Sequence, residues 1–229
     1  MRRSIPIILV LIMVMAGFAC KSNRTEISGL VSGGEGLNLS LERLDVNRTS
    51  VIDSVMIDMD GSFKIKLELD EPELYILKSD KGDIMNLLVK PGERISLQTG
   101  YDTFGSSYSI SGSEESEGIR LLVEQLEQTR SDLDSLQIVA TTIGDPDSPQ
   151  MELLKSTYAQ AIVKQKRFTI KYLVENLGSL SSVYALYQKY DEEAMILSKE
   201  GDLQYFKAVA DSLESSYPNS SLPRSLRAD

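Results

Sequence analysis

The sequence of 229 residues contains no histidine and no tryptophan, and its single cysteine is Cys20. The missing histidine excludes serine-histidine-acid hydrolysis, the histidine-containing zinc sites and proton transfer by imidazole. One cysteine cannot form a Cys-x-x-Cys dithiol, which excludes thiol redox chemistry of that type. The missing tryptophan removes the broadest stacking surface for sugars, although the ten tyrosines provide narrower ones. We therefore expect a protein that is not an enzyme and holds no metal and no cofactor.

The first residues have the three parts of an export signal. Two arginines precede an uncharged apolar run at residues 5–16, and small residues follow that run. A transmembrane helix needs roughly 20 apolar residues, so the run is too short to remain in a bilayer. We therefore expect residues 1–19 to be a signal peptide that is removed.

The residues before Cys20, Gly17-Phe18-Ala19, resemble the lipobox of bacterial lipoproteins. The resemblance implies that the Cys20 thiol carries a diacylglyceryl group and that the new amino terminus is acylated, as with palmitate. Two or more acyl chains, at about 0.8 kcal/mol per buried methylene, hold a protein on a membrane almost permanently. Residues 20–25 would then form a lipidated tether. The alternative is an ordinary cleaved signal followed by a free cysteine.

The chain is acidic, with a formal net charge of -10 at pH 7. Nucleic acid and anionic lipid surfaces are also negative, so we expect no nucleic-acid partner and no electrostatic attraction to the membrane. Contact with the membrane then depends on the lipid at Cys20.

Residues 26–113 alternate apolar and polar side chains in short runs separated by turns. Phe63, Ile65 and Leu67 share one face of such a run, and Asp60-Gly61 before them is a tight-turn signal. This pattern predicts an antiparallel β-sandwich. The expected strands are Glu26–Ser32, Leu37–Leu44, Ser50–Asp58, Ser62–Leu69, Glu73–Lys78, Ile84–Lys90, Arg94–Thr99 and Tyr108–Gly112.

Residues 114–220 have helical periodicity, so the expected fold class is α+β. One long helix begins near Ser113 and stops at Gly144, and a second spans about Gln150–Leu177, which predicts an antiparallel helical hairpin. Two shorter helices are expected over Ser179–Tyr190 and Asp202–Tyr217, before a polar tail at residues 221–229. The first long helix is acidic and the second is basic; this pattern fits either charge pairing between the helices or two solvated faces.

The order of these segments resembles the N-terminal domain of unknown function of the DUF4369 type, found in Bacteroidota lipoproteins of the thiol:disulfide interchange type. The motifs that carry the likeness are Ile27-Ser28-Gly29, Asp53-Ser54-Val55, Asp60-Gly61-Ser62-Phe63, Lys90-Pro91-Gly92-Glu93, Ser111-Gly112-Ser113, 176–182 and Tyr217-Pro218-Asn219-Ser220. In that family the domain usually precedes a thioredoxin-like domain with a Cys-x-x-Cys pair. Because this sequence has no such pair, the resemblance implies only the accessory, non-redox part.

Three tyrosines, Tyr184, Tyr187 and Tyr190, recur at three-residue spacing. Such a stripe is expected to pack in a core or an interface, and the alternative is a platform for a sugar or a peptide. Glu114, Glu115 and Glu117 stand at a helix start, where carboxylates complement the helix dipole; the alternative is acid-base catalysis or cation binding.

Three serines lie in Asp-Ser-apolar triplets: Ser54, Ser135 and Ser212. These triplets resemble the O-glycosylation acceptor of Bacteroidota periplasmic proteins. The resemblance implies modification of at least one serine, provided that its side chain is accessible.

The expected function is therefore that of a non-catalytic, lipid-anchored protein of the cell envelope that binds or assembles other proteins. Its expected partners are the membrane, through the lipid, and a protein, either a thioredoxin-like protein or a second copy of the chain. The alternative is a surface lipoprotein that binds a glycan or nutrient. No acidic residue directly follows Cys20, which speaks against the surface-export signal of some of these bacteria and favours the periplasmic face of the outer membrane.

Overall fold

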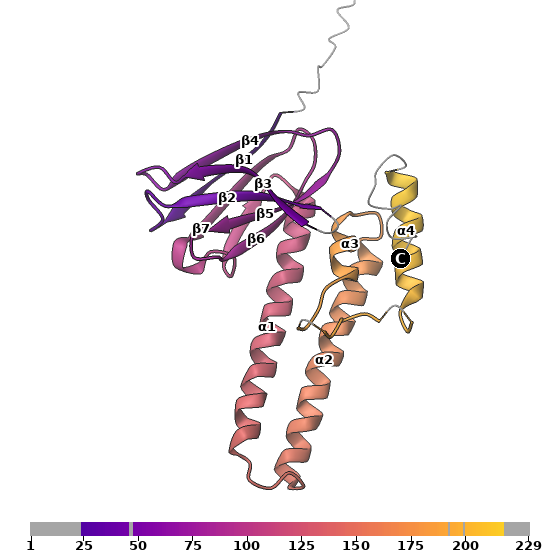
Figure 1. The fold of residues 1–229 in the computed structure, drawn as a ribbon. Coiled ribbons are helices and arrows are strands. Elements are labelled where there is room, and N and C mark those ends of the chain that lie inside the picture. Colours follow the sequence, from indigo (N-terminus) through magenta and orange to yellow (C-terminus); the bar gives the residue numbers. More distant parts are fainter. Residues whose placement is uncertain (1–23, 46–47, 192, 199, 218–229) are drawn as a thin grey trace, which may run out of the picture.

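A computed structural model describes residues 24–45, 48–191, 193–198 and 200–217. Cys20, the expected signal peptide and the polar tail at residues 221–229 lie outside the described residues. The predicted α+β class is confirmed: eight strands form two sheets, and four α-helices follow them in the chain (Figure 1). None of the helices in the described ranges is long and apolar enough to cross a membrane.

The two sheets of the sandwich have four strands each. One sheet has the order β4-β1-β7-β8 and the other has the order β3-β2-β5-β6. All neighbouring strands are antiparallel except β1 and β7, which run parallel. The strands are β1 (Arg24–Ser32), β2 (Asn38–Asp45), β3 (Arg48–Met56), β4 (Ser62–Glu68), β5 (Glu73–Ser79), β6 (Ile84–Val89), β7 (Arg94–Gly100) and β8 (Tyr108–Ser111).

Alternation places one face of each sheet in a shared core. Along β4, Phe63, Ile65 and Leu67 are buried while the residues between them are exposed. The β3–β4 turn has Gly61 at a φ of +80°, a conformation open to glycine, and Asp60 accepts a hydrogen bond from the Ser62 amide at 2.9 Å. Turn chemistry and alternation thus specify the hairpin locally.

The helices are α1 (Glu114–Thr142), α2 (Pro149–Glu175), α3 (Ser181–Leu186) and α4 (Leu203–Ser216), and a 3-10 turn, η1 (Tyr101–Thr103), precedes β8. Ser113 and Ser148 cap α1 and α2 by accepting bonds from the backbone amides of Ser116 at 3.3 Å and Met151 at 3.2 Å. The pair α1 and α2 forms the predicted antiparallel hairpin, whose far end extends away from the sandwich (Figure 1).

A second core joins the helices to the sandwich. Leu88 of β6 points away from the first core and is fully buried against apolar side chains of the helices, which include Ile119, Leu122, Leu173 and Leu186. The helical region therefore packs on the outer face of the β3-β2-β5-β6 sheet, at its β6 edge.

The ion pairs formed by α1 and α2 lie within one helix or reach residues outside the hairpin. Arg120 binds Glu117 and Glu124 of its own helix at 2.9 and 2.8 Å, and Lys166 binds Asp202 at 2.8 Å. In the described ranges no ion pair joins α1 to α2. Of the two interpretations of the charge pattern, solvated faces agree with the structure.

Candidate functional site

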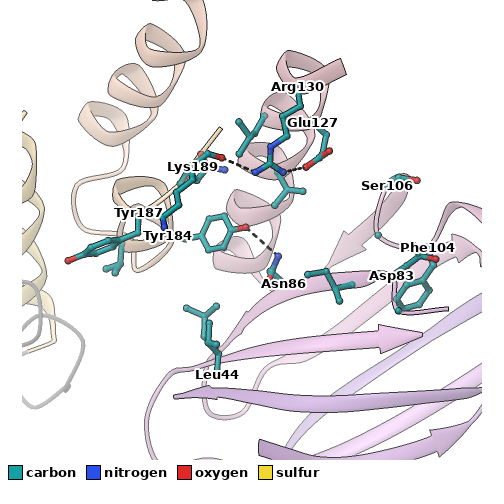
Figure 2. Close-up of a pocket in the computed structure, with 18 residues that line it drawn as sticks. Leu44, Asp83, Asn86, Phe104, Ser106, Glu127, Arg130, Tyr184, Tyr187 and Lys189 are labelled. Atoms are coloured by element: carbon teal, nitrogen blue, oxygen red, sulfur yellow. Dashed lines mark hydrogen bonds and ion pairs between the residues drawn. The ribbon is translucent and has the colours of Figure 1, made fainter. Parts of the chain in front are cut away.

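A cavity of about 760 Å³ lies where the sandwich meets the helices (Figure 2). A volume of this size is typical of ligand pockets, which run from roughly 300 to 1,000 Å³. The outer face of the sheet forms its floor, and α1 and the end of α3 form the opposite wall. Its lining comprises Leu44, Leu74, Gly82, Asp83, Ile84, Asn86, Phe104, Gly105, Ser106, Val123, Leu126, Glu127, Arg130, Val183, Tyr184, Tyr187, Gln188 and Lys189.

Asn86 and Tyr184 bridge the two walls of the cavity. The Asn86 side-chain amide donates a hydrogen bond to the Tyr184 hydroxyl at 3.3 Å, as Figure 2 shows. Burial raises the pKa of the Tyr184 hydroxyl to about 12. Tyr184 is therefore a neutral phenol at physiological pH, and its own proton is available to an acceptor in the cavity.

Arg130 fixes the chain that follows α3. Its Nε donates to the Tyr190 carbonyl and its Nη2 to the Lys189 carbonyl, each at 2.8 Å, and it also forms an ion pair with Glu127. Hydrogen bonds donated by a charged guanidinium are stronger than those between neutral groups. The α3 wall is thus held against α1 by charge-assisted bonds.

Gln188 places an unsatisfied acceptor in this wall. Its side chain is 5% exposed, and its Nε2 donates to the Leu122 carbonyl at 3.1 Å. Its Oε1 is buried and has no partner within the described ranges. Buried polar atoms are almost always hydrogen-bonded, so this oxygen is an exception in the wall, and because it is buried it is not exposed to a molecule in the cavity.

A second polar cluster lies at the start of α1 and differs in character. Glu115 is 4% exposed, and one of its oxygens accepts bonds from the Ser179 hydroxyl at 2.5 Å and the Ser181 amide at 2.9 Å. Ser181 also bonds the Tyr172 hydroxyl at 2.7 Å, and Lys90 lies 3.9 Å from the carboxylate. Because its partners satisfy the carboxylate, we assign this cluster to the joint between β6, α1 and α2.

The three carboxylates at the helix start do not form one site. Glu115 is buried, Glu114 is exposed, and Glu117 is engaged by Arg120. Among the described residues, no group of three or more histidine, cysteine, aspartate or glutamate side chains could hold a metal ion.

The three tyrosines of the predicted stripe lie in two different environments. Tyr184 and Tyr187 line the cavity, whereas the Tyr190 hydroxyl donates to the Ile162 carbonyl of α2 at 2.9 Å. The ring of Tyr187 packs edge-on against Phe206, with centroids 5.8 Å apart and an interplanar angle of 86°. The stripe is thus part of the helical packing as well as the cavity wall.

The serines of the Asp-Ser-apolar triplets lie apart from the cavity. Ser54 in β3 and Ser135 in α1 are exposed, while Ser212 in α4 is half-buried. Accessibility therefore favours the first two as acceptors. Cys20 is outside the described residues, and its lipidation stays a prediction.

Comparison with protein families identifies the first half of the fold. Residues 25–119 match a family described as "Domain of unknown function (DUF4369)". This segment is a DUF4369 domain. The domain covers all eight strands and the first turns of α1, so it supplies the sheet floor of the cavity. The opposite wall comes from α1 beyond the match and from α3.

Comparison with solved structures lists a 9R-lipoxygenase from Cyanothece PCC8801 at 10% identity and a TM-score of 0.25. The similarity covers 69% of this chain and 32% of the lipoxygenase, and at that score it says nothing about fold or activity. No curated protein shows significant similarity to the chain.

The sequence analysis singled out Tyr184 and Tyr187 as part of a stripe expected in a core or an interface, but it did not single out Asn86, Arg130 or Gln188. Asn86 lies in a strand of the DUF4369 domain about a hundred positions before Tyr184, with which it bonds. The one signal in the sequence was an asparagine, a residue that is rare in strands, within the otherwise apolar run Ile84-Met85-Asn86-Leu87.

We expect Tyr184→Phe to change how stability depends on pH. Below pH 10 the Tyr184 phenol is protonated in both the folded and the unfolded chain. Between pH 10 and about 12 the unfolded chain loses this proton while the folded chain keeps it, so stability falls as the pH rises. The wild type should lose about 2 to 3 kcal/mol over this range through Tyr184 alone.

The measurement is the free energy of unfolding in urea at pH 8 to 11.5 for both proteins. At pH 8 the variant should be about 1 kcal/mol less stable, because the bond from Asn86 is lost. Above pH 10 the gap should close and then reverse, because the loss expected through Tyr184 is larger than the gap at pH 8. The titration of the other tyrosines cancels in the difference. A gap that stays constant with pH would contradict the burial of this phenol.

Proposed function

We propose that the chain is a non-catalytic, lipid-anchored protein of the bacterial cell envelope that binds another protein in the cavity between its DUF4369 domain and its helices. The lipid on Cys20 would hold it at the membrane, with the periplasmic face of the outer membrane as its expected place. A thioredoxin-like redox protein and a second copy of this chain are the partners to test first.

The observation that carries the proposal is the composition of the cavity wall. Apolar side chains such as Leu44, Ile84 and Val183 dominate it, and its hydrogen-bonding groups include the Tyr184 hydroxyl of α3 and the Asn86 side-chain amide of β6. Apolar contact with a few placed donors and acceptors suits a polypeptide, which offers both. The missing histidine and dithiol support binding over catalysis.

Glycan or nutrient binding receives less support from the same wall. Sugars stack on open aromatic faces, but Tyr187 is packed against Phe206, and Tyr184 is tied through its hydroxyl to Asn86. Phe104 is also almost fully buried, at 3% exposure. The cavity thus presents edges and hydroxyls where a sugar platform would present ring faces.

Filling the cavity should abolish partner capture. Val123 is half-buried in the α1 wall, so Val123→Trp would place an indole in the cavity without emptying either core. We expect recovery of the partner to fall at least about tenfold, which corresponds to 1.4 kcal/mol of binding. The measurement is quantitative mass spectrometry of proteins that co-purify with the lipidated chain from its host envelope.

Val163→Trp is the matched control, because Val163 lies on the exposed side of α2 and is 46% exposed. It should leave recovery unchanged. The wild type and both variants should all melt cooperatively. If the Val123 and Val163 variants recover the same proteins in the same amounts, the cavity is not the binding site.

A further inference from the structure

β6 is an edge strand, so one side of its backbone faces away from β5 and pairs with no strand. On that side, one residue lies open between two closed positions. At Leu88, the amide donates to the Ser116 hydroxyl at 3.1 Å, and the carbonyl accepts from Ser116 at 2.8 Å and Ser113 at 3.2 Å. The peptide groups of Leu88 therefore point away from β5, and side chains of α1 take the place of a further strand. Alternate residues of a strand point their peptide groups to the same side, so those of Asn86 and Ile84 also point away from β5.

The two ends of this edge are closed. At one end the α1 serines hold Leu88. At the other end the backbone of Gly105 lies against Ile84, so closely that a Cβ on Gly105 would lie 2.4 Å from the Ile84 carbonyl oxygen. Gly105 has a φ of +83°, which glycine adopts without strain. Between these closures, the amide and carbonyl of Asn86 have no hydrogen-bond partner in the described ranges.

Asn86 lies at the cavity, as do Ile84 and Gly105. Figure 2 shows the Asn86 side chain rising from the sheet toward Tyr184. A residue paired directly with Asn86 would place its own side chain on the same face of the sheet. That side chain would enter the apolar part of the cavity.

We propose that the cavity binds an extended polypeptide segment that pairs with the Asn86 backbone through two hydrogen bonds and inserts one apolar side chain. This inference rests on the proposed function and specifies its ligand. Strand addition gives affinity through main-chain bonds and specificity through a side-chain pocket. Here the closed edge limits the pairing to a single residue, so the apolar side chain is the main anchor.

The charge around the cavity predicts the charge of the bound polypeptide segment. Asp83 is exposed at the rim and forms no ion pair in the described ranges, and the chain as a whole carries a net charge of -10. The lining also holds two cations, but Arg130 pairs with Glu127 and Lys189 has an interaction of its own. The net charge of the chain and the Asp83 carboxylate therefore favour a positive ligand. The segment therefore carries lysine or arginine beside its apolar anchor.

The test begins with random 12-residue peptides displayed on phage and selected against the lipidated chain in detergent. Selected peptides should share one large apolar residue flanked by a basic one. In a synthetic copy, N-methylation of the residue that pairs with Asn86 should weaken binding at least about tenfold, because it removes a main-chain donor. N-methylation at the two neighbouring positions should change affinity less than about threefold, since their peptide groups face away from β6.

Hydrogen exchange gives a second readout. The Asn86 amide should exchange at least about a hundredfold more slowly when the peptide is bound. The Met85 amide, already paired with β5, is the internal control and should not change. Asp83→Asn should weaken the peptide, whereas Asp58→Asn, at an exposed turn of the sandwich, should not.

The outcomes separate this inference from the proposed function. Strand pairing is overturned if N-methylation has the same effect on affinity at every peptide position and the exchange rate of the Asn86 amide does not change. If Val123→Trp still abolishes binding in that case, the cavity remains the protein-binding site. Selection of no peptide also overturns this inference. The proposed function is then decided by the co-purification experiment with Val123→Trp.

Discussion

Replacing Cys20 by serine is expected to move the protein from the membrane fraction to the soluble fraction. A serine hydroxyl cannot take the thioether-linked diacylglyceryl group that the lipobox resemblance implies. One acyl chain gives only reversible membrane binding, with an association constant of about 10⁴ M⁻¹, whereas two or more chains hold a protein almost permanently. The variant should therefore go from nearly complete membrane association to nearly none. The measurement is fractionation of host cells with metabolic palmitate labelling.

Lys21→Ser is the matched control, since it changes the next residue and leaves the lipobox intact. It should remain labelled and membrane-bound. Intact mass of the wild type gives an independent readout, because the mature chain should begin at Cys20 with the added mass of its acyl groups. A wild type with an unmodified, reactive thiol or an uncleaved leader would exclude the anchor, whatever the fractionation shows.

Local patterns in the sequence predicted the individual strands and helices closely. Alternation from Phe63 to Leu67 and the Asp60-Gly61 turn specify β4, and the caps at Ser113 and Ser148 specify where the long helices begin. These signals act within a few residues of one another. The third helix ends at Leu186, earlier than the predicted Tyr190, because the following residues pair with a later segment: Lys189 forms a β-bridge with Met195.

The order of strands in the two sheets could not be predicted in the same way. The parallel pairing of β1 with β7 joins Ile27 to Ile95, and no local pattern encodes a contact over such a separation. The cavity depends on the same kind of contact. Leu44, Asn86 and Gln188 each have an ordinary local context, and they line one cavity only when the helices pack on the outer face of the sheet.

The buried cluster at Glu115 makes this packing specific, so Glu115→Ala should be strongly destabilising. The change removes the acceptor for the Ser181 amide and the Ser179 hydroxyl and leaves both buried donors unpaired. Removing one partner of a buried charged network costs about 3 to 5 kcal/mol. We expect a loss of this size in the free energy of unfolding, measured in urea on the mature chain with Cys20→Ser.

Glu114→Ala is the matched control, because Glu114 is exposed at the same helix start and shares the dipole interaction but not the buried bonds. It should cost only about 0.3 to 1 kcal/mol. Glu115→Gln should fall between the two, since its amide oxygen can still accept from Ser181 while its negative charge is lost. Equal costs for Glu114→Ala and Glu115→Ala would mean that the cluster does not hold the helices to the DUF4369 domain. The cavity walls would then owe their position to apolar packing around Leu88 alone.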